Sequence, residues 1–494
     1  MLIIRLRLLF VSICVLMATG CATLPDTQFL TDKYRTQAAQ FENARGPISA
    51  KRSAAIVARL KRQSGDAGIT DSDMLDKQIA LEQEVVGNPL VVGNKVTLLQ
   101  DGPATYKAMF VAIAAAKDHI NVESFIIDDD EIGKQFADLL IERQTHGVQV
   151  NLLYDSIGAL GTAATFFDQL TKAGVQVLEF NPVNPLKGKK SWTPNHRDHR
   201  KLLIVDGHIA FLGGVNISSV YSSGSSVKRE RNSEKDKNNT LTQPDVGWRD
   251  TDVQIEGPVV SQFQQLFIET WDKQKGRSLT NPSNSPATNL ASGQTSSNIA
   301  QKDYFPEIAA QGNEIVRAIG STPDDPYSLI YLTLISAITN AEKQVYITNA
   351  YFVPDPQLLK ALLDAAARGV DVRLILPKHT DSSAAYYAGR SYFSELLKGG
   401  VKIYERRDAL LHAKTAIVDG IWACVGSSNL DWRSALDNDE INAVILGREF
   451  SQQMQVAYVQ DIAASDEVDL ATWQHRSLLL RLKEMGARLF GRFL

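Results

Sequence analysis

Two stretches of the sequence place the same chemically active residue types at the same spacing. HRKLLIVD begins at His199, and HAKTAIVD begins at His412. Each has a lysine two residues after the histidine and an aspartate seven residues after it. Residues two apart on a strand point to the same face, so each imidazole is expected beside an ammonium group. This pairing favours an anionic ligand, and a phosphoryl group is the commonest biological anion.

Two further residue types recur downstream of each histidine. A glycine follows fourteen residues later, at Gly213 and Gly426, and an asparagine follows seventeen residues later, at Asn216 and Asn429. At a glycine, which has no Cβ, the backbone can approach phosphate oxygens closely, and an asparagine amide donates hydrogen bonds to such oxygens. Two such half-sites, facing one another across a pseudo-twofold axis, would supply two histidines, two lysines and two asparagines to one phosphate.

The segments around each motif follow the same order. Apolar residues at three- and four-residue steps predict helices, and short Val- and Ile-rich segments bounded by Gly or Pro predict strands. The first half has predicted helices at 104–118, 131–147 and 164–174, and strands at 119–127, 148–155 and 175–181. The second half has predicted helices at 328–343, 356–369 and 391–400, and strands at 344–352, 370–377 and 401–406. This alternation predicts an α/β fold with helices on both faces of a sheet, built once in each half.

The duplicated pattern His-x-Lys-x4-Asp-x6-Gly-(Gly/Ser)-x-Asn resembles the phospholipase D superfamily. The internal duplication extends the resemblance over most of residues 100–450. It implies two duplicated phospholipase D-like α/β/α sandwich domains, related by a pseudo-twofold axis, with one shared active site. A single copy of the motif would be weak evidence, whereas two copies that agree in residue type and spacing are specific.

The resemblance implies a role for each motif residue. His199 and His412 are implied to be the nucleophile and the general acid. The groups implied to bind the substrate phosphate are the motif lysines, the asparagines and one serine: Lys201, Lys414, Asn216, Asn429 and Ser428. Asp206 and Asp419 complete the two catalytic motifs and are implied to support the hairpins without touching substrate.

Members of the superfamily also use an acidic side chain to orient each imidazole. Glu440 lies 28 residues after His412 and suits that role, and the matching strand of the first half, WRDTDVQIEGP, points to Asp250. Both could instead be ordinary cap or surface acids. Histidine, aspartate and glutamate do not recur at metal-ligand spacing, and Cys424 is the only cysteine beyond Cys21, so we expect neither a metal nor a cofactor.

The N-terminus resembles a bacterial lipoprotein signal. Arg5 and Arg7 precede the apolar run LLFVSICVLMATG, and Cys21 follows it. The resemblance implies lipidation of Cys21 and, because residue 22 is Ala, attachment to the periplasmic face of the outer membrane. An ordinary secretory signal with an incidental cysteine is the alternative. Acyl chains on Cys21 would anchor the chain to a membrane.

We expect six segments along the chain. They are a lipoprotein signal peptide at 1–20, a polar, helical lead-in at 21–95, a first phospholipase D-like domain at 96–274, a polar linker at 275–305, a second such domain at 306–460 and an amphipathic tail at 461–494. A charged insertion at 219–245 interrupts the first domain and is either a solvated loop or a lid. The tail has an apolar stripe with basic residues beside it: Leu478, Leu482, Met485, Leu489 and Phe493, then Arg481, Arg488 and Arg492. This stripe suits either an anionic membrane surface or the protein's own core.

The phrases WRDTDVQIEGPVV, HRKLLIVDGHIAFLGGVNIS and MGARLFGRFL resemble the bacterial cardiolipin synthases of the lipoprotein-like type. The resemblance implies phosphatidyl transfer to phosphatidylglycerol, with or without phosphatidylethanolamine, through a phosphohistidine at a membrane surface. The alternatives are a phospholipase D that releases phosphatidic acid, a nuclease, and an inactive lipid-binding lipoprotein. A net charge of −4 argues against nucleic acid as a partner, and both motifs keep every residue that the chemistry needs. We expect a monomer, and the sequence does not identify an accessory protein.

Overall fold

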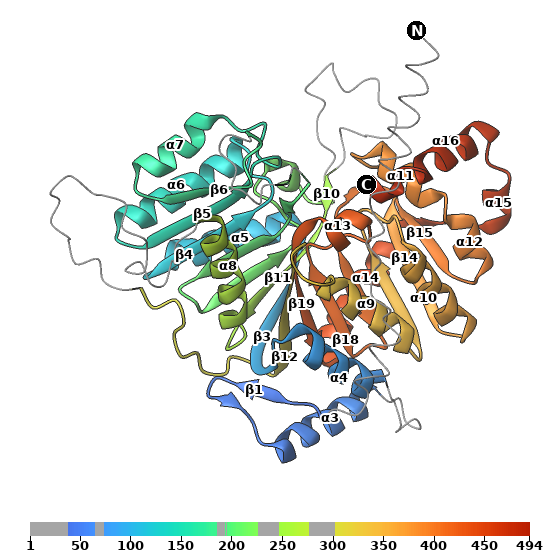
Figure 1. The fold of residues 1–494 in the computed structure, drawn as a ribbon, viewed down its shortest axis with the longest axis horizontal. Coiled ribbons are helices and arrows are strands. Elements are labelled where there is room, and N and C mark those ends of the chain that lie inside the picture. Colours follow the sequence, from blue (N-terminus) through green and yellow to red (C-terminus); the bar gives the residue numbers. More distant parts are fainter. Residues whose placement is uncertain (1–37, 65–73, 185–192, 194, 226–246, 276–301) are drawn as a thin grey trace, which may run out of the picture.

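The structure is a computed structural model, and it describes residues 38–64, 74–184, 193, 195–225, 247–275 and 302–494. The predicted signal peptide, Cys21, and most of both the 219–245 insertion and the 275–305 linker lie outside the described residues. Two α/β halves lie side by side, the first coloured cyan to green and the second orange to red in Figure 1.

The first half is a mixed sheet covered by helices. Its strands are β3 (Leu90–Gln100), β4 (His119–Ser124), β5 (Gln149–Asp155), β6 (Gln176–Phe180), β7 (Arg197–Asp198), β8 (Lys201–Val205), β9 (Ile209–Gly213), β10 (Trp248–Arg249) and β11 (Thr251–Glu256). Its helices are α5 (Asp101–Ala115), α6 (Glu131–Thr145), α7 (Ala164–Lys172), α8 (Val260–Lys275) and the short 3-10 helix η1 (Ser219–Tyr221). The sheet order is β3-β11-β9-β8-β4-β5-β6, and only β4, β5 and β6 are parallel neighbours.

The second half repeats this order. Its strands are β12 (Glu314–Ser321), β13 (Gln344–Thr348), β14 (Asp371–Pro377), β15 (Lys402–Arg406), β16 (Leu410–Leu411), β17 (Thr415–Val418), β18 (Trp422–Gly426), β19 (Asn438–Leu446) and β20 (Ser465–Glu467). Its helices are α9 (Leu329–Asn340), α10 (Pro356–Ala367), α11 (Ser383–Arg390), α12 (Phe393–Lys398), α13 (Trp432–Leu436), α14 (Arg448–Ala463), α15 (Leu470–Gln474), α16 (Leu478–Arg488) and η4 (Gly491–Phe493). The sheet order β12-β19-β18-β17-β13-β14-β15 matches that of the first half strand for strand, with β20 added at the edge. The expected duplicated α/β fold is therefore confirmed.

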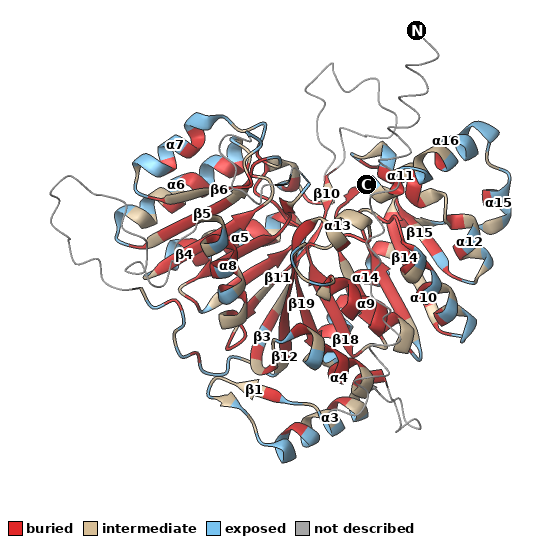
Figure 2. Cartoon of the chain, viewed as in Figure 1, coloured by how far each residue is buried: buried red, intermediate tan, exposed pale blue. Residues whose placement is uncertain are grey.

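The two halves join through equivalent elements. Strands β3 and β12, which open the two halves, pair with each other in antiparallel register, as a pseudo-twofold relation requires. One apolar cluster contains side chains of both halves, among them Phe263 and Phe267 of α8 and Phe450 and Met454 of α14. Helices α5 to α7 cover the outer face of the first sheet, and α9 and α10 cover that of the second. Figure 2 shows the strands of both halves buried between these helices.

The chain before β3 packs mainly on the second half. It contains β1 (Phe41–Asn43), β2 (Gly46–Pro47), α3 (Ala50–Ser64) and α4 (Met74–Val86). Helix α4 buries Glu82, which forms a 3.0 Å ion pair with Arg317 and accepts a 2.9 Å hydrogen bond from the indole of Trp422. Removing one partner of such a buried pair costs about 3–5 kcal/mol, so α4 is part of the core and not only a polar lead-in.

The predicted helices and strands are present, with differences at their ends. Strands β4 and β13 end at Ser124 and Thr348, three or four residues before the predicted ends. The elements that the prediction did not contain include β3, β12, α8, α11 and α14. Among the described residues, no helix is both long and apolar enough to cross a membrane.

Candidate active site

Each motif lies on a tight β-hairpin with Asp-Gly at its turn. Asp206 and Asp419 have φ values of 53° and 52°, and the glycines after them also have positive φ, as a two-residue hairpin turn requires. The Asp206 carboxylate accepts backbone N–H groups of residues 117–119 at 2.7–3.0 Å, and Asp419 does the same for residues 342–344 at 2.8–3.0 Å. Both aspartates therefore fix the hairpins to the start of β4 and β13, at the opposite end of β8 and β17 from the histidines.

Each histidine lies opposite an acid of the other half. The residues before His412 pair in parallel with those before Asp250, and the residues before His199 pair in parallel with those before Glu440. The backbone N–H of His199 donates to Asp439 at 2.9 Å, and that of His412 donates to Arg249 at 2.8 Å. This register brings His199 Nδ1 to 3.0 Å from Glu440 Oε1, and His412 Nδ1 to 2.8 Å from Asp250 Oδ2.

The two carboxylates fix the tautomer of the imidazoles. A carboxylate only accepts, so each Nδ1 carries the proton and each Nε2 keeps its lone pair. Burial lowers the pKa of His199 to about 4, although the charge of Glu440 acts to raise it. Burial and Lys414 lower the pKa of His412. Both imidazoles are therefore neutral at pH 7 before an anion binds.

The acids themselves are held ionised. Burial acts to raise the pKa of Glu440, but His199 and Lys201 outweigh it and lower the pKa. Burial likewise opposes the ionisation of Asp250, and His412 and its hydrogen bond again lower the pKa. The site thus couples each neutral imidazole to an anionic partner that stabilises an imidazolium once one forms.

Each motif lysine lies beside the histidine of its own motif, and the charges of these groups affect one another. Lys201 donates to the backbone oxygen of His199 at 2.6 Å, and Lys414 donates to that of His412. Burial and the second lysine lower the pKa of Lys201 to about 7, and burial lowers that of Lys414 to about 8. Burial and mutual repulsion disfavour the charged forms of both lysines, and an anion bound between them would offset both effects.

The asparagines differ in their surroundings. Asn216 accepts from the N–H of Ile126 at 3.0 Å and donates to the hydroxyl of Tyr221 at 2.9 Å, so much of its amide is already bonded. The Asn429 Oδ1 is buried and has no hydrogen-bond partner among the described residues. Asn429, and not Asn216, is therefore the motif asparagine whose side-chain amide has an unfilled hydrogen bond.

Ser427, which was not among the predicted site residues, bonds to Glu440, whereas the predicted serine was its neighbour Ser428. Ser428 is half-buried, and its hydroxyl donates to the backbone oxygen of Asn429 at 3.4 Å. Its neighbour Ser427 is fully buried and donates to Glu440. The matching residue of the first half is Gly214, where an added Cβ would lie 2.1 Å from Asp250 Oδ1. The sequence contains a signal for this difference, because the first motif has Gly-Gly where the second has Gly-Ser.

Aromatic rings surround the two histidines unequally. Phe125 lies 5.1 Å from the His199 ring, centroid to centroid. Trp248, Tyr221 and Tyr351 lie 5.2, 5.7 and 6.3 Å from the His412 ring. Phe125 and Tyr351 lie just beyond β4 and β13, in the segments where the predicted strands ran too far.

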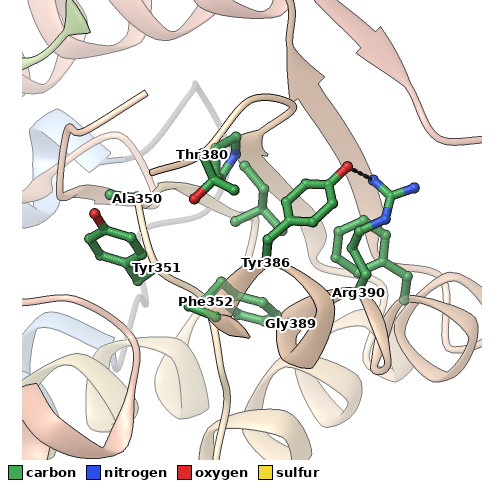
Figure 3. A pocket seen from close by; sticks show the side chains of 11 residues that line it. Ala350, Tyr351, Phe352, Thr380, Tyr386, Gly389 and Arg390 are labelled. Atoms are coloured by element: carbon green, nitrogen blue, oxygen red, sulfur yellow. Dashed lines mark hydrogen bonds between the residues drawn. The ribbon is translucent and has the colours of Figure 1, made fainter. Parts of the chain in front are cut away.

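A pocket opens beside Tyr351 on the second half. It encloses about 290 Å³ of empty space, including its mouth, between the ends of β13 and β14 and helix α11. Figure 3 shows Tyr351, Thr380 and Tyr386 around it, with Arg390 donating to the Tyr386 hydroxyl at 2.8 Å. Most of its other walls are apolar, among them Phe352, Leu376 and Phe393. Within the described residues, histidine, cysteine and acidic side chains form no group of three or more that could hold a metal.

The duplicated fold and the paired His-Lys motifs are those of the phospholipase D class of enzymes. The chain belongs to the family described as cardiolipin synthase, PLD-like domain, whose model matches residues 109–240 and 334–462. A cardiolipin synthase from Geobacillus sp. (strain WCH70) is 33% identical over 416 residues, 84% of this chain and 75% of the relative. Cardiolipin synthase 2 from Bacillus anthracis is 32% identical over 396 residues, 80% of this chain and 69% of the relative.

A solved structure shares the fold at lower identity. Phosphatidylserine synthase from Haemophilus influenzae Rd KW20 superposes with a TM-score of 0.60 at 14% identity, over 84% of this chain and 99% of that chain. Together with the family match, these relatives identify the protein as a phospholipase D-type phosphatidyltransferase.

Proposed function

We propose that this protein makes cardiolipin by transferring a phosphatidyl group from one phospholipid to a hydroxyl of phosphatidylglycerol. His199 is the nucleophile, His412 is the general acid and base, and a phosphohistidine is the intermediate. The observation that carries the proposal is the crossed pairing of each neutral imidazole with a buried carboxylate of the other half, beside two buried lysines. The names of the relatives support the choice of product.

In the first step the free Nε2 of His199 attacks phosphorus. The bond between phosphorus and the headgroup oxygen breaks, and that oxygen leaves with a proton from His412. The bound phosphate anion raises the pKa of His412, which therefore takes up a proton from solvent on Nε2 and passes it to the leaving oxygen. Lys201 and Lys414 stabilise the charge on the equatorial oxygens, and the Asn429 amide donates to the same group.

In the second step the acceptor hydroxyl gives its proton to His412 and attacks phosphorus. The bond between phosphorus and the His199 nitrogen breaks, so the imidazole is restored and the phosphatidyl group is now on the acceptor. Glu440 and Asp250 stay ionised throughout and orient the rings. If water takes the place of the acceptor, the product is phosphatidic acid.

The first test measures whether the protein transfers the phosphatidyl group or hydrolyses the lipid. Water is abundant, so a transferase must hold an acceptor hydroxyl close to phosphorus and in line with it. On vesicles that contain phosphatidylglycerol, with or without phosphatidylethanolamine, we expect cardiolipin to form faster than phosphatidic acid. Mass spectrometry of the lipid products at several acceptor densities measures the ratio.

The same assay contains its own controls. Added chelator is expected to leave the rate unchanged, because no step of the proposal uses a metal. Phosphatidic acid as the main product at every acceptor density would assign the protein to the hydrolases. Loss of all activity with chelator would contradict the two-histidine mechanism.

We also propose that acyl chains on Cys21 anchor the protein to the periplasmic face of the outer membrane. The Cys21→Ser chain is expected to leave the membrane fraction or to stay unprocessed, since acyl chains provide the stable anchor. Fractionation followed by a high-salt wash measures this, with Cys424→Ser as the matched control, because Cys424 is buried within β18. A processed Cys21→Ser protein that stays fully membrane-bound after the wash would place the anchor elsewhere.

A further inference from the structure

We infer that the tail helix α16 and two loops of the first half form a docking face that places the mouth of the active site on an anionic phospholipid bilayer. The inference rests on the proposed function, because it names the surface from which that site takes its lipids. The docking face is defined by exposed apolar side chains: Ile157, Leu160 and Val183 of the loops, and Leu478, Leu479, Leu480, Leu482, Met485, Leu489, Phe490 and Phe493 of the tail.

Helix α16 packs on the protein through its polar side. Glu484 is 2% exposed and its carboxylate lies 2.8 Å from Arg476. Arg488 lies over the ring of Tyr392, and Lys483 lies over that of Tyr387, both on or next to α11. These contacts fix the rotation of the helix, so the apolar stripe faces solvent: Leu478 is 75% exposed and Leu489 is 71% exposed. Figure 2 shows α16 as a largely exposed helix at the edge of the second half.

The tail is connected to His412 through Val353 and Tyr351. Gly491 lies against Val353, where an added Cβ would be 3.3 Å from Val353 Cγ1. Val353 forms a small apolar cluster against which Tyr351, Ala487 and Leu494 pack. Tyr351 in turn contacts the His412 ring and lines the pocket of Figure 3. In Figure 1 the C-terminus accordingly lies beside α13, which directly follows the second motif.

The loops of the first half reach the same site from the other side. Ile157 and Leu160 follow β5, and the backbone at Gly158 packs so closely on Phe125 that an added Cβ would lie 2.0 Å from the Phe125 oxygen. Phe125 is the residue whose ring contacts His199. Val183 follows β6 and donates its N–H to Ser156 at 2.9 Å, which ties the two loops together.

The clustering of exposed apolar residues distinguishes this face. Of the fifteen large apolar side chains that are exposed among the described residues, three lie in these loops and eight in the tail, which makes eleven. Residues 475–494 carry five basic side chains and one acid, while the whole chain has a net charge of −4. The acid, Glu484, is already paired. An apolar stripe beside a local surplus of basic side chains fits the headgroup region of anionic lipids.

The test measures vesicle binding without turnover. The chain starting at residue 21 carries Cys21→Ser, so that no acyl anchor contributes. We expect it to float with vesicles that contain phosphatidylglycerol, to bind pure phosphatidylcholine vesicles less well, and to lose binding as salt rises. Leu482→Ser with Leu489→Ser should weaken binding by at least about tenfold, because both leucines would no longer enter the apolar layer.

The matched control is Val456→Ser with Val459→Ser on α14, two exposed apolar residues outside the docking face. This pair should bind vesicles like the parent chain, and both double variants should keep the parent's thermal unfolding midpoint. Equal vesicle binding by the two double variants would overturn the inference. A second outcome would also overturn it. If the parent chain sedimented as a dimer, and Leu482→Ser with Leu489→Ser made it a monomer that still bound vesicles, the face would be an interface between two copies of the chain. Because binding needs no catalysis, a failure of phosphatidyl transfer leaves this readout unchanged.

Discussion

Replacing either motif histidine by alanine is expected to reduce phosphatidyl transfer by about 10⁴-fold or more, and replacing both is expected to reduce it no further. The reason is that His199 and His412 act on the two ends of one displacement, so removing either stops the same step. Cardiolipin formation from labelled phosphatidylglycerol in mixed micelles measures the loss for the His199→Ala, His412→Ala and double-substituted chains.

His146→Ala is the matched control, because that imidazole is exposed at the end of α6 and bonds to the Glu142 backbone oxygen at 2.7 Å. Its rate should stay within about twofold of the parent. Losses that multiply in the double variant would mean that the histidines serve independent steps. A phosphohistidine trapped on His412 in the His199→Ala chain would reverse the assignment of the nucleophile.

Local patterns predicted most of the fold. The helices and strands that follow each other in both halves have clear periodicity, and the Asp-Gly turns of the hairpins are encoded by two residues each. Strands β3 and β12 were missed because what makes them strands is their pairing with β11, β19 and each other, across up to about 220 residues. Neither has the regular alternation of a half-buried strand.

The motif spacing also predicted which acids and histidines belong to the site, but not which acid bonds to which histidine. Spacing placed Glu440 after His412 and Asp250 after His199, within the same half. In the structure each acid bonds to the histidine of the other half, since short parallel pairings join β7 to β19 and β10 to β16. Contacts between segments this far apart leave no local signal in the sequence.

Adjacent serines show the same limit at smaller scale. Ser427 and Ser428 follow Gly426, and only the strand register determines which hydroxyl faces Glu440. Side chains alternate at the end of a strand, so neighbouring residues point to opposite sides. The sequence identified Ser428, whereas the structure brings Ser427 to the carboxylate.

The crossed pairing leads to a second prediction with a large effect. Glu440→Gln is expected to slow transfer by about 10³- to 10⁴-fold, because a neutral amide neither fixes the His199 tautomer as well nor stabilises the imidazolium. The Glu440 charge raises the pKa of His199 against the larger lowering effect of burial, which leaves that pKa at about 4. Without this charge the pKa falls further. The acid limb of kcat/KM, which reports protonation of the nucleophile, should therefore move to lower pH.

Two matched variants separate this role from a structural one. Ser427→Ala removes one hydrogen bond to Glu440 but keeps its charge, so it should slow transfer by about five- to tenfold without moving the limb to lower pH. Asp250→Asn should slow transfer as strongly as Glu440→Gln but leave the His199 limb in place, because Asp250 bonds to His412 at 2.8 Å. If Asp250→Asn moved the low-pH limb and Glu440→Gln did not, His412 would be the nucleophile. If neither moved it, the two carboxylates would only support the fold.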